Sequence, residues 1–384
     1  MNRKPSILMP IQWYHPGYKA GGLIQALRRI NANLKENFQI YVLTTDRDLG
    51  SSIPYTNITA DVWLPMEEGV QVKYLSKEKT SYRQIAKEIK NLNPDIIYLK
   101  SIFNPRFSLY VLWYLERKQH HASIILAPSG MLRQSSLLQK WWKKYPTLMM
   151  LRRMRTIRNI QWHATDQQEC KDIQKHFGKN IRLSLLSEFP PPVIENIPAL
   201  EKKPILKLLF LSRIHPVKNL LFLLRILQKV KSPVKLSIAG PIEDEQYWAT
   251  CQKLLARLPS HISTSYLGDI PQNKVAPLFQ EHHLFALPTI GEGFGNVILE
   301  AMANACPVLI SDQTPWRNLL KYNAGRDIPL EKPEAFVSAI ESFAGMEQAE
   351  YDLCRKAALA YAENIIDVKA LKKNYVKMFL AAKR

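Results

Sequence analysis

The sequence predicts an α/β protein built from two doubly wound, Rossmann-like domains. Apolar, strand-like runs alternate with helical patterns along most of the 384 residues, which is typical of parallel sheets covered by helices. A proline-rich span without periodicity, residues 188–204, separates two such series. The hydrophobic content of 46%, with 25 prolines and 14 glycines, is that of an ordinary soluble α/β enzyme.

In the first half, six apolar runs predict strands, and helical periodicity fills most of the intervals between them. The expected strands cover 6–9, 39–45, 70–75, 95–99, 123–127 and 160–164. The expected helices cover about 21–36, 81–92, 105–118, 132–144 and 166–177. Gly21 and Gly22 lie at the first strand-to-helix connection, the edge at which ligands meet open α/β sheets, although a simple tight turn explains them equally well.

The second half repeats the alternation. Strands are expected near 206–211, 234–239, 263–267, 284–287 and 308–311, with helices at about 218–230, 245–258, 271–281 and 296–305. From residue 333 onward the chain is expected to be helical and carries no chemical motif. We therefore predict an N-terminal domain at 1–187, a linker at 188–204, a C-terminal domain at 205–365 and a last helix at 366–384 that packs back on the N-terminal domain.

The net charge of +20 is unevenly distributed and restricts the partners to anionic ones. Residues 1–190 carry 29 Lys and Arg against 14 Asp and Glu, so most of the excess lies in the first half. Such a field attracts nucleic acid, anionic lipid or phosphorylated substrates, and the charge alone does not choose among them. No nucleic-acid-binding module is recognisable, so nucleic acid is not an expected partner.

One segment combines this charge with large apolar side chains. Residues 117–165 contain ten Lys and Arg and no acidic residue, interleaved with tryptophan, tyrosine, leucine and methionine. This mixture favours the surface of an anionic bilayer. The alternative is a solvated basic helix pair whose tryptophans and methionines belong to the core. The expected membrane face consists of Lys140, Trp141, Trp142, Lys143, Lys144, Arg152 and Arg153.

Residues 284–316 carry the strongest pattern for chemistry. An apolar run leads into a loop with Gly291, Gly293 and Gly295, followed by a helical pattern and a second apolar run. Glycines at such a turn allow a ligand to approach the backbone, and the amides of Asn296 and Val297 begin a helix whose positive end favours a diphosphate. This loop is therefore a candidate phosphate site.

Two carboxylates flank the loop. Glu292 precedes the helix, and Glu300 lies about one turn inside it, on the face of Asn296, with its side chain leaning toward the N-terminus. A carboxylate beside a diphosphate is repelled unless it accepts hydrogen bonds from hydroxyls, and a nucleotide provides a ribose diol. Two exposed glutamates on a common glycine-rich turn can also be only a solvated face. If the two glutamates bind a ligand, the predicted ligand is a nucleotide with a further group attached.

The stretch EGFGNVILEAMANACPVLISD resembles the Glu-x7-Glu signature of the family-4 retaining glycosyltransferases, with both glutamates, Gly293, Phe294, Gly295 and the EAMA-x-x-x-PV segment in place. The N-terminal PGYKAGGLIQALRRINANL resembles the bacterial members that build surface polysaccharides, where the glycine pair faces the donor. The resemblance implies the GT-B fold, with two Rossmann-like domains facing a central cleft.

The same resemblance assigns further residues. Arg213 and Lys218, in LFLSRIHPVKNLL, match the R-x4-K pair that binds the donor phosphates in that family. Ser129 stands where the family often has a basic residue, so that residue's role does not transfer. His163 belongs to a segment of the HAT-S-x-x-E kind; it either reaches the cleft or bonds neighbouring backbone.

The implied reaction moves a hexosyl group from a nucleotide diphosphate sugar to a hydroxyl of a glycan or a lipid diphosphate-linked glycan, with retention. Glu292 would hold sugar hydroxyls, Glu300 the ribose, and Arg213 and Lys218 the diphosphate. The resemblance implies that no metal and no other cofactor is needed, so Asp46 and Asp48, although spaced as Asp-x-Asp, are interpreted as loop residues.

Two other function classes stay open. A sugar-nucleotide epimerase of this fold would share the phosphate site, and a non-catalytic anion- or membrane-binding protein would share the charge. The four separated cysteines support neither a zinc site nor a disulfide framework and fit a reducing cytoplasm. No signal-peptide core or spanning segment is recognised, so we expect a cytoplasmic protein at the inner face of the plasma membrane.

Overall fold

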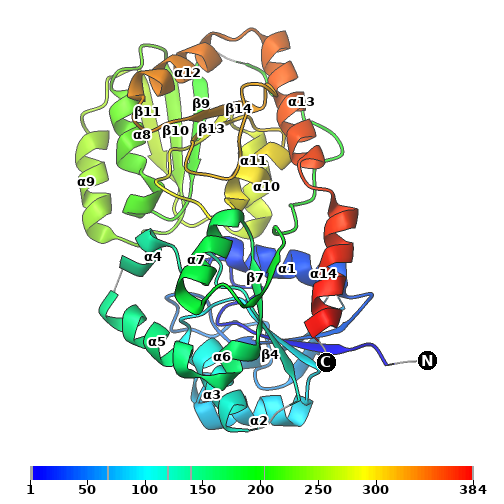
Figure 1. Ribbon diagram of the computed structural model, residues 1–384. Helices are drawn as coiled ribbons and strands as arrows, with labels where there is room; N and C mark the ends of the chain where they lie inside the picture. The colour runs from blue at the N-terminus through cyan, green and yellow to red at the C-terminus, as the bar shows by residue number, and fades with distance from the viewer. Residues whose placement is uncertain (1–2, 67–68, 119–120, 139–140, 203, 383–384) are drawn as a thin grey trace. The chain divides into compact units, whose positions relative to one another are not determined.

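The computed structural model describes residues 3–66, 69–118, 121–138, 141–202 and 204–382, apart from the side chain of Ser135. The chain divides into two compact units (Figure 1). Unit 1 contains residues 1–189 and 368–384, and unit 2 contains residues 190–367.

Unit 1 is organised around an eight-stranded sheet in the order β3-β4-β2-β1-β5-β6-β7-β8, parallel except for the antiparallel pair of β3 and β4. The strands are β1 Ser6–Pro10, β2 Gln39–Thr45, β3 Trp63–Pro65, β4 Gln71–Leu75, β5 Ile96–Leu99, β6 Ser123–Leu126, β7 Gln161–Ala164 and β8 Arg182–Leu185. The central strands are buried along their whole length, which is why they are continuous apolar runs in the sequence.

The helices of unit 1 cover this sheet. They are α1 Gly22–Leu34, α2 Tyr82–Leu92, α3 Tyr110–Arg117, α4 Gln134–Leu138, α5 Trp141–Arg153, α6 Arg155–Asn159, α7 Gln167–Phe177 and α14 Val368–Ala382. Short turns at Lys77–Lys79 (η1) and Pro105–Leu109 (η2) precede α2 and α3. The last helix, α14, packs against α1 and β6, and its Phe379 contacts the rings of Phe38 and Tyr98.

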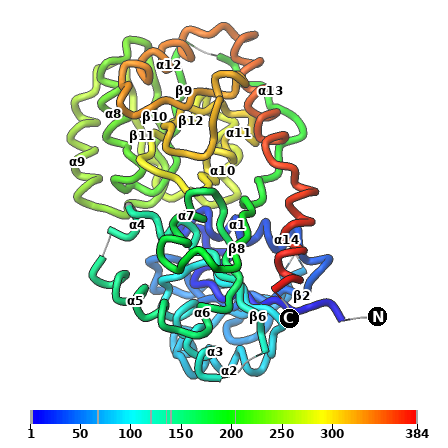
Figure 2. The backbone as a smooth tube through the Cα atoms, in the orientation of Figure 1, coloured from blue at the N-terminus to red at the C-terminus, as the bar shows by residue number. Residues whose placement is uncertain are grey.

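Unit 2 has a six-stranded, fully parallel sheet in the order β11-β10-β9-β12-β13-β14. Figure 2 traces the backbone of this unit through β9, β10, β11 and β12. The strands are β9 Leu206–Leu211, β10 Val234–Ala239, β11 Ile262–Tyr266, β12 Leu284–Leu287, β13 Val308–Ser311 and β14 Gly325–Ile328. The helices are α8 Leu220–Leu227, preceded by the turn η3 Pro216–Lys218, then α9 Glu245–Leu255, α10 Gln272–Gln280, α11 Asn296–Ala303, α12 Pro333–Gly345 and α13 Gln348–Asn364.

The sheets confirm the predicted fold class of two doubly wound α/β units. Three strands, β3, β8 and β14, were not predicted, because each is short and lies at a sheet edge with little of the burial that produces an apolar run. The helix predicted over 132–144 corresponds to α4 and α5, which lie on either side of residues 139–140, outside the described part of the chain. Its predicted end is wrong, because α5 continues through Pro146 to Arg153, where Leu148 and Leu151 are buried in the core of unit 1.

Most of the proline-rich span packs on unit 2. The Ile194 amide donates to the carbonyl of Ala303 (3.1 Å), and the buried Arg355 donates to the carbonyl of Pro198 (2.8 Å). Glu188 and Phe189 belong instead to unit 1, where Glu188 accepts from Lys100 (2.8 Å) and Phe189 contacts the Tyr375 ring on α14. The span is therefore fixed at both ends.

Candidate functional site

The strand-loop-helix-strand unit predicted at 284–316 is formed by β12, α11 and β13. Gly295 caps α11 with a left-handed φ of 73°. A Cβ there would lie 3.1 Å from both Ile298 Cδ1 and Trp316 Nε1. The Trp316 ring packs against the ring of Phe294, with the ring centroids 5.0 Å apart, and Phe294 is only 9% exposed. Gly295 and Phe294, both predicted to bind the donor, thus have structural roles in holding the loop against the core of unit 2.

Gly291 and Gly293 are different. Neither has a left-handed backbone, and a Cβ built on either would meet no described heavy atom within 4 Å. Packing within unit 2 therefore does not require glycine at these two positions. The open space beside the loop leaves its backbone accessible to a ligand, which is the use that the sequence predicted for these glycines.

The N-terminus of α11 lies at the end of this loop. The amides of Ile298 and Leu299 donate to the carbonyl of Gly295 (3.0 and 3.4 Å). Asn296 and Val297 come before them, and the first amides of an α-helix have no acceptor within the helix itself. Asn296, Val297 and Glu300 are all half-buried, so they remain accessible at the positive end of the helix.

Lys218 and Glu292 form an ion pair beside this loop, and their side chains are only 13% and 12% exposed. Hydrogen bonds fix the backbone on both sides of the pair. The carbonyl of Val217 accepts from the Ile290 amide (2.8 Å) and from the Thr289 hydroxyl (2.9 Å). The Glu292 amide donates to the carbonyl of Gln313 (3.0 Å). The two residues, 74 positions apart in sequence, are therefore held at one place.

Arg213 follows β9 and forms an ion pair with Glu243, which follows the neighbouring strand β10. Both side chains are nearly half exposed, at 45% and 44%. The two segments are joined by hydrogen bonds from Ile214 to Pro241 (2.8 Å) and from Glu243 to Ile214 (3.2 Å). Sequence reasoning missed Glu243. The signal that could have found it is an acidic residue just after the strand that neighbours β9 in a parallel sheet.

The backbone packing of unit 2 requires glycine at position 240, at the end of β10. Its φ is 122°, and a Cβ there would lie 2.2 Å from the carbonyl oxygen of Ser212. The glycine therefore allows the segment that carries Arg213 to pass close to the end of the neighbouring strand.

Gly21 and Gly22 belong to unit 1, where Gly21, with a φ of 66°, caps α1 and Gly22 is its first residue. The carboxylate of Asp48 holds the preceding loop by accepting from the amides of Tyr18 (2.9 Å) and Lys19 (3.2 Å), as well as from Leu49 (2.7 Å). Asp48 is 8% exposed.

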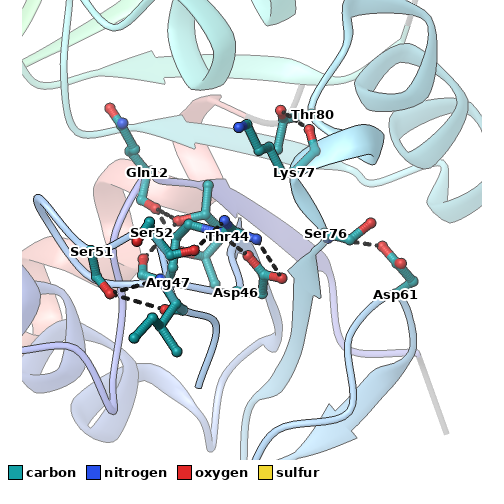
Figure 3. Close-up of polar contacts among 12 residues, drawn as sticks. Gln12, Thr44, Asp46, Arg47, Ser51, Ser52, Asp61, Ser76, Lys77 and Thr80 are labelled. Atoms are coloured by element: carbon teal, nitrogen blue, oxygen red, sulfur yellow. Dashed lines mark hydrogen bonds and ion pairs between the residues drawn. The ribbon is translucent and has the colours of Figure 1, made fainter. Parts of the chain in front are cut away.

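Asp46 also has a partner from the protein. Its carboxylate accepts from the guanidinium of Arg47 (2.8 Å), which in turn donates to the carbonyl of Ser52 (2.8 Å), as Figure 3 shows. Asp46 and Asp48 are thus engaged in organising the loop after β2. Within the described part of the chain, no group of three or more His, Cys, Asp or Glu side chains is placed to hold a metal ion.

His163 is fully buried in unit 1. Its Nε2 atom lies 2.9 Å from the carbonyl oxygen of Leu186, and its Nδ1 atom lies 2.9 Å from the Tyr98 hydroxyl. Burial lowers the pKa of His163 to about 4. Of the two interpretations offered by the sequence, the structure supports backbone bonding. Ser129 has a left-handed φ of 52°, and its buried hydroxyl has no hydrogen-bond partner among the described residues.

The basic and aromatic segment presents a mixed surface on α5, which runs along the outside of unit 1 in Figure 1. Six exposed side chains fall within about a third of the helix circumference: Trp141, Trp142, Tyr145, Met149, Arg152 and Arg153. We call these six the α5 surface. Both tryptophans and Met149 are 57% exposed, so they do not belong to the core, whereas Met154 does.

The other residues of the expected membrane face differ from one another. Lys143 is exposed, on another side of α5. Lys144 is half-buried, and its ammonium donates to the Ser136 carbonyl (2.5 Å) and lies 5.6 Å from the centre of the Phe103 ring. Lys140 lies outside the described residues. No helix in the described part of the chain combines the length and apolarity needed to cross a bilayer.

Comparison with known proteins places this site within a recognised domain. Residues 206–345, which include Arg213, Lys218 and the whole glycine loop, match the family described as Glycosyl transferases group 1. Over 112 residues the chain is 31% identical to the O-antigen chain mannosyltransferase B of Escherichia coli, and the alignment spans 28% of each protein. The chain thus matches under a third of the length of that relative.

The fold extends over the whole chain. A structure of HepE from Anabaena in complex with UDP and glucose aligns with a TM-score of 0.70 at 14% identity, covering 98% of this chain and all of HepE. WaaG, a glycosyltransferase involved in lipopolysaccharide biosynthesis, aligns with a TM-score of 0.65 at 15% identity, covering 97% of this chain and 99% of WaaG. This protein therefore has the GT-B fold, with a Glycosyl transferases group 1 match across the part of unit 2 that holds Lys218, Glu292 and the N-terminus of α11.

Proposed function

We propose that the protein is a retaining glycosyltransferase that moves a hexosyl group from a nucleotide diphosphate sugar to a hydroxyl of an acceptor. The observation that carries this proposal is the grouping of Lys218 and Glu292 beside an open glycine loop at the positive end of α11, within the segment that matches the Glycosyl transferases group 1 family. The glutamate spacing supports family 4 and, with it, retention.

In this reaction the residues of unit 2 have separate roles. As the bond between sugar and phosphate breaks, negative charge grows on the leaving diphosphate. Lys218, Arg213 and the first amides of α11 stabilise that charge without needing a metal ion. Glu300, one turn inside α11, accepts from the ribose hydroxyls. Glu292 accepts from sugar hydroxyls and steadies the positive charge that develops at the anomeric carbon, as carboxylates do in glycoside chemistry. Gly21 and Gly22 in unit 1 contribute backbone on the donor side.

The proposed acceptor is a glycan or a lipid diphosphate-linked glycan for bacterial surface polysaccharide, made at the inner face of the plasma membrane. The α5 surface supports this location, because tryptophan, tyrosine and methionine side chains with two arginines between them suit the headgroup region of an anionic bilayer. The same acceptor class is supported by the relative named as an O-antigen chain mannosyltransferase and by WaaG, which is involved in lipopolysaccharide biosynthesis.

The proposal is tested by following the donor in buffer containing EDTA, with and without membrane lipid extract as the acceptor source. We expect sugar to pass to lipid-linked material and nucleoside diphosphate to be released only when acceptor is present. Turnover of the donor without acceptor would instead indicate an epimerase. Activity that EDTA abolishes and manganese restores would contradict the metal-free mechanism.

A further inference from the structure

We propose that Lys218 and Glu292 form an exchangeable ion pair, in which a bound diphosphate takes the Lys218 ammonium and leaves the Glu292 carboxylate for the hydroxyls of the sugar. This inference rests on the proposed function and adds an order to it: the diphosphate must be engaged before the sugar can be held. Lys218 and Glu292 then act as one device rather than as two independent contacts.

The proposed exchange is confined to the side chains of Lys218 and Glu292. The backbones that carry the two residues are fixed by the hydrogen bonds of Val217 and of the Glu292 amide, so any exchange involves side chains and not the loop. A lysine side chain suits this, because its ammonium is a point charge with three donors on a flexible stem. The side chains are 13% and 12% exposed, so the attraction is much less screened by water than that of a surface pair.

Each proposed phosphate-binding cation is paired with a carboxylate within unit 2, Lys218 with Glu292 and Arg213 with Glu243. The Arg213 pair is nearly half exposed and is easily replaced, whereas the Lys218 pair is not. A diphosphate carries more charge than a carboxylate, so it is the stronger partner for the ammonium. Glu292 is therefore a competitor of the diphosphate for Lys218.

Glu292 has two states in this exchange. While it is paired with Lys218, its oxygens are engaged by the ammonium, and a sugar hydroxyl must compete for them. Once Lys218 has moved to the phosphate, the partly buried carboxylate has lost its paired cation and gains by accepting hydrogen bonds from hydroxyls, because hydrogen bonds stabilise a charge that is shielded from water. The exchange thus supplies the Glu292 carboxylate with new partners only when a sugar accompanies the diphosphate.

This coupling has a signature that a merely structural role does not produce. In Glu292→Gln the competitor is removed, so the bare nucleoside diphosphate should bind more tightly, by about threefold or more. The same variant loses the charged acceptor for the sugar, so the nucleotide sugar should bind more weakly, by roughly tenfold. The two ligands therefore respond in opposite directions to one substitution.

The experiment is calorimetric titration of the full chain with UDP, GDP and ADP and with their glucose and mannose derivatives, for wild type, Glu292→Gln, Lys218→Met and the double variant. In Lys218→Met, the further change Glu292→Gln should no longer tighten the diphosphate. The matched control is Glu334→Gln, which removes a carboxylate paired with Lys229 on the surface of unit 2 and should alter neither affinity. If Glu292→Gln does not fold, Lys218→Met tests the exchange by comparison of two ligands. It should weaken the bare diphosphate more than the nucleotide sugar, because Glu292 is then available to the sugar from the start; equal weakening of both ligands would overturn the exchange.

The outcomes separate the two proposals. Equal weakening of diphosphate and nucleotide sugar by Glu292→Gln, or no change in either, would overturn the exchange while wild-type binding upholds the proposed function. Failure of wild type to bind any of these nucleotides would overturn the proposed function itself, and the exchange with it.

Discussion

The ammonium of Lys218 and the carboxylate of Glu292 meet in an ion pair although one follows β9 and the other follows β12. These two strands are neighbours in the parallel sheet of unit 2, so their carboxyl ends lie at one edge, where open α/β sheets bind ligands. The pair joins the proposed phosphate contact to the proposed sugar contact.

The cations should carry much of the affinity for the diphosphate. Lys218→Met or Arg213→Met should each weaken nucleoside diphosphate binding by about tenfold to a hundredfold, because each removes charge-assisted hydrogen bonds to phosphate. Calorimetric titration in metal-free buffer measures this. Lys229→Met, which removes a surface cation paired with Glu334, serves as the control, and equal losses in all three variants would refute a local role.

Substitution of the two glutamates should impair different functions. Glu300→Gln should weaken binding of the nucleotide, because it removes the charged acceptor for the ribose hydroxyls. Glu292→Gln should weaken binding of the nucleotide sugar and lower turnover without weakening the bare nucleoside diphosphate, because its partner is the transferred sugar. Titration gives the affinities and a radiolabelled donor gives the turnover. The division of roles would be wrong if both variants lost affinity for the bare nucleoside diphosphate to the same extent.

The glycines of the loop should separate stability from binding. Gly295→Ala should lower the free energy of unfolding by about 1–3 kcal/mol, since φ is left-handed there and a Cβ would crowd Trp316 and Ile298. Gly293→Ala should leave the melting temperature nearly unchanged yet weaken nucleotide binding, since the space beside it is open. Thermal denaturation and titration together check this pair, and normal binding by Gly293→Ala would argue against ligand approach at that position.

The α5 surface should bind anionic bilayers. Wild type should co-sediment with vesicles containing phosphatidylglycerol at low salt and less at high salt, because charge attraction is screened. Replacing Trp141 and Trp142 by serine should reduce the bound fraction several-fold. Trp113→Ser, at another exposed tryptophan of unit 1, should have little effect. If wild type failed to bind vesicles at any salt concentration, the proposed membrane location would fail.

Stability should fall in mild acid. Burial lowers the pKa of His163 in unit 1 and of His283 in unit 2 to about 4, against an ordinary value near 6.5. Between these values the unfolded chain binds more protons than the folded one, so stability is fully present above about pH 6.5 and is lost as the pH falls toward 4. Melting temperatures from pH 7.5 to 4.5 measure the slope. His163→Gln should flatten it for unit 1, and an unchanged slope would contradict the assignment.

Much of the fold could be predicted because the buried parallel strands produce apolar runs. The strands at 39–45, 206–211, 234–239, 284–287 and 308–311 have the bounds that the sequence indicates. The edge strands were not predicted because they are only partly buried and do not form apolar runs. The full length of α5 was not predicted because a proline in the sequence usually indicates the end of a helix. The helical stretch after residue 333 was predicted correctly, since its helical pattern continues over many residues.

The site was predictable in its residue types and less so in its pairings. The glycine spacing predicted the turn before α11, and strand ends indicated where Arg213 and Lys218 would lie. The sequence did not separate the glycines that packing requires, such as Gly295 and Gly240, from those facing open space, such as Gly293. Nor did it predict that each cation would meet a carboxylate, because Glu243 and Glu292 come from other strand ends that only the sheet order brings close.

The proposed function requires unit 2 to bind a nucleotide diphosphate sugar without a metal, and a thermal-shift screen of the purified protein in EDTA tests this requirement. UDP, GDP, ADP and their common sugars are compared at millimolar concentration, since a ligand that binds only the folded state raises the melting temperature. We expect the ligands that share one base to raise the melting temperature, both as the nucleoside diphosphate and as its sugar derivative. No shift with any of these nucleotides would contradict a donor site at Lys218, Glu292 and α11.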